Sequence, residues 1–324
     1  KTYYQNLLPK PTTKTYYQMS SPLTPQIFEK SDVDGWKAHL ESEGFVVIKD
    51  ILSPEEKTHA FDLFKRDLNT VSTNFNFEDK TTWTIENCPL MFGKGMAVFN
   101  GFGQSDFMWN LRLNSEIQAI FKTIYGCDEL VTSLDGFSMF VSKKQKSKSW
   151  LHIDQNPANT IYSIQGAYNF MPVNSVQDAG FVLVPKSHET YKPTISHKKD
   201  WIICDTTEPI LAESRKLIIP ENCMTLWNSK TIHANEGMTK SGVELNRLTT
   251  YITYQPKVLR SAPIRQKRID AYKNARTTSH WANKCELKSY PFGFKSRYEA
   301  RGYHKITSML DENGEIPAER LALL

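Results

Sequence analysis

The stretch Trp150-Leu151-His152-Ile153-Asp154 places a histidine and an aspartate two positions apart within a short apolar run. On a β-strand, residues i and i+2 project from the same face, so His152 and Asp154 are expected to point together into one cavity. An imidazole nitrogen and a carboxylate oxygen placed in this way supply two ligands of a 2-His-1-carboxylate metal site. The same short pattern also surrounds histidines that only hydrogen-bond inside a core, so the interpretation needs a third ligand elsewhere.

A third ligand and a cation are available further along the chain. His233 lies 79 residues after Asp154, and Arg247 follows 14 residues after His233, where Asn246-Arg247-Leu248-Thr249 opens an apolar β run. The planar fork of a buried arginine pairs bidentately with a carboxylate. The spacing therefore predicts a metal held by His152, Asp154 and His233, with Arg247 beside it to anchor the carboxylate of a bound molecule.

Short runs rich in Val, Ile, Phe, Thr and Tyr flank these residues on both sides and are separated by turn residues. They are Gly136–Ser142, Trp150–Ile153, Ile164–Pro172, Gly180–Val184, Ile202–Cys204, Cys223–Trp227 and Leu248–Gln255. Regularly spaced short strands of this kind are typical of an antiparallel sandwich or barrel.

Helices are predicted ahead of these strands. Ser53-Pro54-Glu55-Glu56 is a strong helix start, because the serine caps the helix, the proline fits its first position and Glu56 can close a capping box. Further helices are predicted over residues 33–40 and 115–125. Residues 1–30 carry four prolines among Thr, Ser and Tyr, and they are expected to form an extended N-terminal arm.

Four motifs in this order resemble the phytanoyl-CoA dioxygenase family of Fe(II)- and 2-oxoglutarate-dependent oxygenases, over about residues 30–256. Gly44–Ser53 resembles the first strand and helix of that family, and His152-Ile153-Asp154 resembles its proximal metal motif. Ala179–His188 is similar to its G-x-L-x-x-x-P-G-S-H stretch, with Lys186 where the family usually has glycine. His233, Asn235 and Arg247 fall where the family has its second histidine, a polar co-substrate contact and its arginine.

The resemblance implies a mainly β fold with helical support. A double-stranded β-helix (jelly-roll, cupin-like) core, about residues 131–256, would pack against N-terminal helices within one oxygenase domain, residues 31–324, that ends in a basic segment, residues 257–324. It also implies Fe(II), 2-oxoglutarate and O2, with ascorbate as a reductant, and hydroxylation or another oxidation of an unactivated C–H bond. Because Asp154 stands where related halogenases have a small residue, hydroxylation is favoured over halogenation.

Other side chains are candidates for the neighbourhood of the metal. Asn235, Gln165 and Met139 are candidate contacts of 2-oxoglutarate, although Met139 could equally be an ordinary core residue. His280 could reach the mouth of the pocket, but packing is the preferred interpretation. His188 is interpreted as structural, because its family counterpart is not a ligand.

Composition excludes several classes of protein. The chain has 324 residues, 40% of them apolar and 23% charged, and no apolar run approaches the roughly 20 residues that span a bilayer. Its five cysteines are scattered without C-x-x-C spacing, which argues against a disulfide framework and a structural zinc site. A cytoplasmic, intracellular setting is therefore expected.

The net charge of +5 is unevenly distributed. Residues 257–305 contain thirteen Lys or Arg against three acids, and Lys143, Lys144, Lys146 and Lys148 directly precede the metal strand. This distribution favours either a small anionic substrate or simply a solvated surface. A nucleic-acid partner is not expected, because no recognition motif accompanies the charge. Two alternative functions stay open. One is an oxygenase that acts on a nucleic acid or a protein side chain, and the other is a non-catalytic metal-binding jelly-roll protein. The sequence does not set the oligomeric state.

Overall fold

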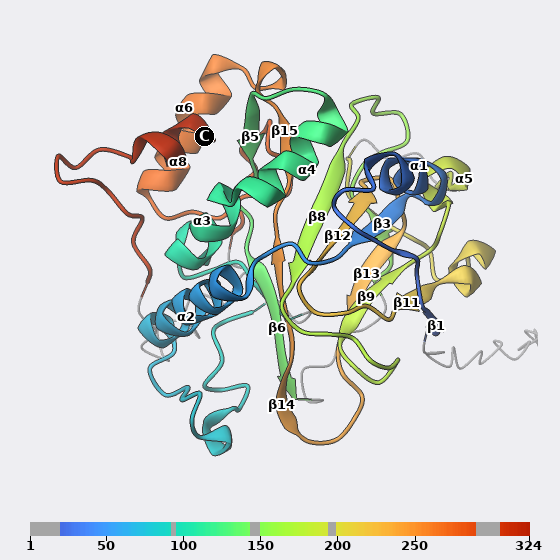
Figure 1. The fold of residues 1–324 in the computed structure, drawn as a ribbon, viewed down its shortest axis with the longest axis horizontal. Helices are drawn as coiled ribbons and strands as arrows, with labels where there is room; N and C mark the ends of the chain where they lie inside the picture. Colours follow the sequence, from blue (N-terminus) through green and yellow to red (C-terminus); the bar gives the residue numbers. More distant parts are fainter. Residues whose placement is uncertain (1–19, 92–94, 143–149, 194–198, 290–304) are drawn as a thin grey trace, which may run out of the picture.

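A computed structural model describes residues 20–91, 95–142, 150–193, 199–289 and 305–324 (Figure 1). Most of the predicted N-terminal arm, residues 1–19, lies outside these ranges, as do the four lysines of residues 143–148. None of the helices in the described ranges is long and apolar enough to cross a membrane.

Eight strands form the two sheets of a jelly roll. One sheet contains the order β12-β8-β14-β6 and the other the order β11-β9-β13-β7, and all neighbours within these two sets are antiparallel. Along the chain they are β6 (Phe137–Ser142), β7 (His152–Ile153), β8 (Ile164–Asn169), β9 (Gly180–Leu183), β11 (Arg215–Leu217), β12 (Cys223–Asn228), β13 (His233–Glu236) and β14 (Val243–Tyr251). The chain changes sheet at every step except from β9 to β11, which confirms the predicted double-stranded β-helix.

Shorter strands extend both sheets at their edges. β1 (Ser21–Leu23) runs parallel to β11, and β2 (Ile27–Phe28) runs parallel to β3 (Phe45–Ile48), which itself pairs with β12. β4 (Met96–Ala97) lies beside β6, and β10 (Ile202–Ile203) lies beside β7. A separate pair joins β5 (Leu130–Thr132) to β15 (Tyr254–Pro256). The described end of the predicted arm thus contributes one edge strand to each sheet.

The helices gather mainly on the outer face of the larger sheet (Figure 1). They are α1 (Val33–Glu43), α2 (Pro54–Val71), α3 (Asp106–Leu113), α4 (Ser115–Tyr125), α5 (Ser187–Thr190), α6 (Ala262–Lys273) and α8 (Ala318–Ala322), with 3-10 turns at Lys80–Thr82, Phe102–Gln104, Pro209–Glu213 and Lys257–Leu259. The predicted capping box at α2 is confirmed: Ser53 Oγ accepts from the Glu56 N–H, and Glu56 Oε2 accepts from the Ser53 N–H.

Alternation along β6 divides the core into two layers. Phe137, Met139 and Val141 belong to the cluster beneath the helices, where Phe64 of α2 packs edge-on against Phe137. Ser138, between them, faces the space between the two sheets and hydrogen-bonds to Tyr251. Because successive side chains of a strand point to opposite faces, the larger sheet contributes side chains both to the core beneath the helices and to the interior of the jelly roll. The metal site lies on this inner side.

The C-terminal basic segment is partly structural. Arg268 of α6 is buried and donates to the backbone carbonyls of Thr132, Lys284 and Leu324. Arg320 of α8 is buried and pairs with Asp106 at the start of α3. These cations tie α6 to β5 and α8 to α3, so a solvated surface does not describe them.

Candidate metal centre

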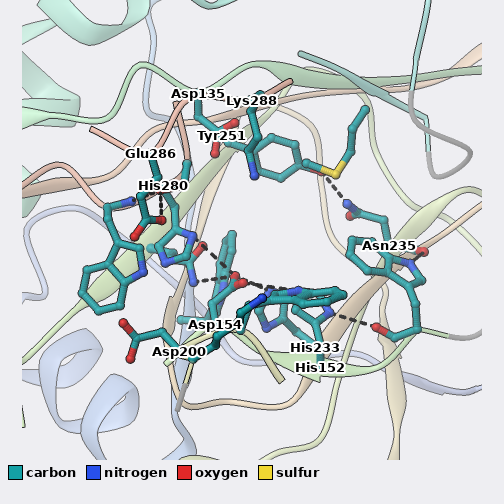
Figure 2. A pocket seen from close by; sticks show the side chains of 18 of the residues that line it. Asp135, His152, Asp154, Asp200, His233, Asn235, Tyr251, His280, Glu286 and Lys288 are labelled. Atoms are coloured by element: carbon teal, nitrogen blue, oxygen red, sulfur yellow. Dashed lines mark hydrogen bonds and ion pairs between the residues drawn. The ribbon is translucent and has the colours of Figure 1, made fainter. Parts of the chain in front are cut away.

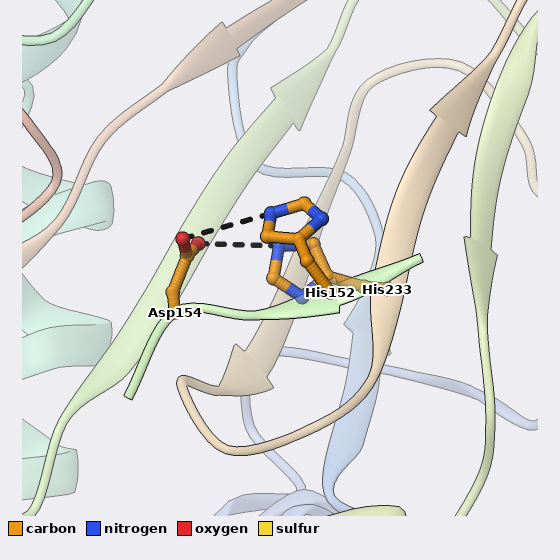
Figure 3. Close-up of side chains that lie close together, drawn as sticks. All are labelled: His152, Asp154 and His233. Atoms are coloured by element: carbon orange, nitrogen blue, oxygen red, sulfur yellow. Dashed lines mark ion pairs between the residues drawn. The ribbon is translucent and has the colours of Figure 1, made fainter. Parts of the chain in front are cut away.

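Two neighbouring strands bring the three predicted ligands together (Figure 3). His152 lies on β7, Asp154 follows directly, and His233 on β13 stands opposite His152 in the strand register. Their potential ligand atoms all lie within 4.8 Å of one another, and all three residues are buried. His152 Nε2 is 3.6 Å from Asp154 Oδ1, and His233 Nε2 is 3.3 Å from Asp154 Oδ2.

The backbone fixes both imidazoles in the orientation that a metal ligand needs. His152 Nδ1 is 2.9 Å from the Trp150 carbonyl, and His233 Nδ1 is 2.9 Å from the Thr231 carbonyl. A carbonyl only accepts, so each Nδ1 carries a hydrogen, and each Nε2 is directed toward Asp154. Trp150 also stacks on His152, with 4.4 Å between the ring centroids.

Asp154 is held as an ionised carboxylate. Burial raises its pKa, but the imidazoles of His280, His152 and His233 outweigh burial and hold the pKa well below its usual range. Gln165 Nε2, on β8 of the facing sheet, donates to Asp154 Oδ2 at 2.9 Å. Two imidazole nitrogens and one charged oxygen, grouped on one side, match the donor set of a facial triad.

Arg247 lies at one end of a hydrogen-bonded chain that leads to the cavity. Its Nη2 donates to Asn235 Oδ1 at 2.9 Å, the Asn235 amide donates to the Tyr251 hydroxyl, and that hydroxyl is 2.7 Å from Ser138 Oγ. Burial lowers the pKa of Arg247, and its Nε and Nη1 are buried with no hydrogen-bond partner in the described part of the chain. Unpaired donors on a buried cation are costly, which points to an acceptor that binds there.

A cavity of about 750 Å³ opens over the three ligands (Figure 2). Its aromatic wall consists of Trp150, Phe181, Trp201, Trp227, Tyr251 and Trp281. Its other charged residues are Asp135, Asp200 and Glu286 on one hand and Lys199 and Lys288 on the other. This size and this mixture of apolar surface with a few polar groups are typical of a pocket for a small organic molecule.

The structure separates the remaining predicted site residues. Gln165 and Asn235 both line the cavity. Gln165 donates a hydrogen bond to Asp154, and Asn235 accepts one from Arg247. Arg247 is not among the described residues that line it, although its partner Asn235 is. For Met139 the structure shows the core alternative: it packs beneath the helices, because it is one position out of phase with the inward-facing Ser138.

Two polar residues of the cavity were missed or set aside in the sequence. His280 lines the cavity with Nδ1 3.8 Å from Asp154 Oδ2, where packing had been the preferred interpretation. Asp135 precedes β6, and burial raises its pKa to about 6 despite the nearby Lys288. Neither has a sequence signal, since both come from irregular segments. His188 lies elsewhere, with Nε2 2.9 Å from the Glu41 carbonyl.

The chain resembles known proteins in sequence and in structure. No family model matches the chain. Ava biosynthesis cluster protein O of Aspergillus versicolor is 25% identical over 249 residues, which cover 70% of this chain and 79% of that protein. The epimerase SnoN, in complex with Fe3+, alpha ketoglutarate and nogalamycin RO, is 16% identical with a TM-score of 0.49, covering 70% of this chain and 84% of that one. HygX of Streptomyces hygroscopicus, with nickel and 2-oxoglutarate bound, is 15% identical with a TM-score of 0.48, covering 69% and 87%.

Proposed function

We propose that this chain is an Fe(II)- and 2-oxoglutarate-dependent oxygenase that oxidises a C–H bond of a small organic substrate. One observation carries the proposal: His152 and His233 direct Nε2 at the Asp154 carboxylate on β7 and β13, while the buried and incompletely paired Arg247 of β14, in the facing sheet, is bonded to Asn235 of β13.

The donor set fits a ferrous ion that keeps coordination positions open. Two imidazoles and one carboxylate on a single face are the ligands of non-haem Fe(II) oxygenases. A zinc hydrolase can use similar donors, so the ligands alone do not decide between the two. Arg247 favours the oxygenase, because hydrolysis of a bond by a metal-bound water gives no reason to bury a cation with two unpaired donors.

The surroundings of Arg247 fit 2-oxoglutarate. This co-substrate carries a keto acid at one end, which chelates a metal, and a second carboxylate at the other end, which needs a cation. Arg247 would hold the second carboxylate through Nη1 and the second hydrogen of Nη2, which share the end of the guanidinium, while Asn235 accepts the other Nη2 hydrogen and keeps the plane in place. Tyr251, hydrogen-bonded to Asn235, lies on the cavity wall.

Bound Fe(II), 2-oxoglutarate and O2 together supply the oxidising power that abstracts hydrogen from an unactivated C–H bond. The residues of the chain orient and enclose the reactants. The two imidazoles direct Nε2 toward the metal position, and Gln165 donates a hydrogen bond to one oxygen of Asp154. The aromatic wall excludes water from the reacting carbon.

The cavity supports a small molecule as the substrate. Its volume of about 750 Å³ and its indole rings suit a compact organic compound with ring or apolar parts. The name of the relative from Aspergillus versicolor places that protein in a biosynthesis cluster, in keeping with such a substrate. That the substrate is anionic stays a prediction: Lys199 and Lys288 line the cavity, but so do Asp135, Asp200 and Glu286.

Turnover of the co-substrate tests this function. Purified protein is incubated with Fe(II), ascorbate and 2-oxoglutarate, O2 is admitted, and succinate is measured for wild type, His233→Ala and Arg247→Ala. We expect slow succinate formation in wild type without a prime substrate, none in His233→Ala and strongly reduced formation in Arg247→Ala. A wild-type protein that neither forms succinate nor binds Fe(II) and 2-oxoglutarate together would overturn the proposal.

A further inference from the structure

One polar side chain at the metal centre is explained neither by the ligand set nor by Arg247. His280 comes from the C-terminal segment, and its side chain is only 12% exposed in the cavity wall. Its Nδ1 lies 3.8 Å from Asp154 Oδ2, and Figure 2 shows the ring directed at that carboxylate. Its Nε2 is buried without a hydrogen-bond partner in the described ranges.

The segment that carries His280 is held firmly against the jelly roll. Thr278 N–H donates to the Leu134 carbonyl at 2.9 Å, and Thr278 forms a β-bridge with Leu287. Ser279 is bonded twice to Glu286, by its N–H to the backbone carbonyl and by its hydroxyl to the carboxylate, both at 2.9 Å. The position of His280 relative to Asp154 is therefore set by the fold.

Gln165 and His280 converge on the same oxygen of Asp154 from different parts of the chain. Gln165 Nε2, from β8, is at hydrogen-bond distance from Oδ2, at 2.9 Å, and His280 Nδ1 is at 3.8 Å. A distance of 3.8 Å is too long for a direct hydrogen bond, but bonds at catalytic sites are often long in the ligand-free protein and tighten when the site is filled. A carboxylate held from two sides presents its lone pairs to a metal in one orientation.

We propose that His280 is a positioning residue of the metal centre, which fixes the orientation of the Asp154 carboxylate without itself being a ligand. The inference rests on the proposed metal site and names a member of it that the three ligands do not include. Burial lowers the pKa of His280 while Asp154 opposes this shift, and the role needs only a neutral ring with its hydrogen on Nδ1. Residues that orient ligands in this way typically change metal affinity 10- to 100-fold when they are replaced.

Binding of Co(II), followed by calorimetry and by its visible absorption, tests the inference without turnover. His280→Phe and His280→Ala remove both ring nitrogens, and His280→Asn restores a donor near the place of Nδ1. His39→Phe is the matched control, because His39 Nε2 is also buried and unpaired but its ring packs against Phe28 and Phe45, outside the cavity. Circular dichroism and the thermal midpoint establish that each variant is folded.

We expect His280→Phe and His280→Ala to bind Co(II) about 10- to 100-fold more weakly than wild type. His280→Asn should recover most of the loss, and His39→Phe should bind like wild type. At saturation, the Co(II) spectrum of all variants should keep the shape and intensity of the wild-type spectrum, because the ligands are unchanged.

Three outcomes would contradict the inference. Wild-type affinity in folded His280→Phe and His280→Ala would show that His280 does not position the carboxylate. A changed Co(II) spectrum at saturation in these variants would show that His280 is itself a ligand. Absence of Co(II) binding in wild type would remove the proposed function along with the inference. The first outcome differs from this one, because Co(II) binding that is lost in His233→Ala but kept in the His280 variants refutes the role of His280 and leaves the metal site standing.

Discussion

Replacing Arg247 by methionine should make the ligand-free protein more stable while removing its affinity for 2-oxoglutarate. The guanidinium is buried, Nε and Nη1 have no partner in the described residues, and only Nη2 is satisfied, by Asn235. Each buried unpaired polar atom costs about 1–3 kcal/mol. Methionine removes two such atoms and leaves one, Asn235 Oδ1, without its donor. The net effect is one buried unpaired polar atom fewer, so the free energy of unfolding of the ligand-free protein should rise by roughly 1–3 kcal/mol.

The loss of co-substrate affinity follows from the end of the same guanidinium, where Nη1 and the second Nη2 hydrogen can reach one carboxylate. A hydrogen bond to a charged group contributes about 1.5–3 kcal/mol, so two bonds to a carboxylate correspond to roughly 3–6 kcal/mol. At about 1.4 kcal/mol for each factor of ten, the Kd of 2-oxoglutarate should rise by about 10²- to 10⁴-fold. Calorimetric titration of the metal-loaded protein measures this change, and urea unfolding of the metal-free protein measures the stability.

Arg260→Met is the matched control, since Arg260 also has Nε and Nη1 buried without partners in the described residues but follows the Lys257–Leu259 turn, whereas Arg247 is bonded to Asn235 of the cavity wall. It should leave the affinity for 2-oxoglutarate unchanged. The reasoning would be refuted if Arg247→Met destabilised the metal-free protein by several kcal/mol and still bound 2-oxoglutarate like wild type, because Arg247 would then be a structural cation.

Three further predictions concern single side chains. Burial raises the pKa of Asp135 from 3.8 to about 6, so the fold holds this proton more tightly than the unfolded chain and loses roughly 3 kcal/mol of stability as pH rises from about 4 to 6. Asp135→Asn should therefore be more stable than wild type at pH 7.5 and equal to it below pH 4 in metal-free urea unfolding; equal stability at both would contradict this. Gln165→Met should weaken Co(II) binding about 10- to 100-fold, through loss of the bond to Asp154, and unchanged affinity would speak against it. Lys186 has a left-handed φ of 62°, so Lys186→Gly should raise stability by about 1 kcal/mol; a lower urea midpoint would show that other contacts of Lys186 outweigh the backbone strain.

Local signals in the sequence predicted much of the fold correctly. The capping box at Ser53 and the glycine after residue 43 are short-range features, and the structure has helices ending or beginning there, with Gly44 at a φ of 78°. The predicted strands over 164–172, 180–184 and 223–227 correspond to β8, β9 and β12. Such signals depend on neighbouring residues only, so a single sequence contains them.

The pairing of the strands was not readable in this way. β6 is buried along its whole length, so it shows no alternation of apolar and polar residues from which an inner face could be chosen. Met139 could therefore be assigned to the pocket or to the core, and the structure puts it in the core, with Ser138 on the inner side of the sheet. β11 and β13 are short and carry Arg215, Lys216, Asn235 and Glu236, so they did not stand out as strands.

The metal ligands could be proposed because their chemistry is recognisable before their positions are known. His152 and Asp154 share a strand face by spacing alone, and the need for a third donor directed attention to His233. His280 had no such partner pattern. It reaches Asp154 only because contacts such as that between Thr278 and the Leu134 carbonyl fold the C-terminal segment back over the cavity.

The most direct test of the account is an anaerobic titration of 2-oxoglutarate into the Fe(II)-loaded protein, followed by the charge-transfer absorption of the metal-bound keto acid. We expect a saturable band in wild type and no band in His233→Ala. Arg247→Met should still bind Fe(II) but develop the band only at far higher 2-oxoglutarate concentration. A wild-type protein that binds Fe(II) and shows no band at any concentration of 2-oxoglutarate would contradict the central claim.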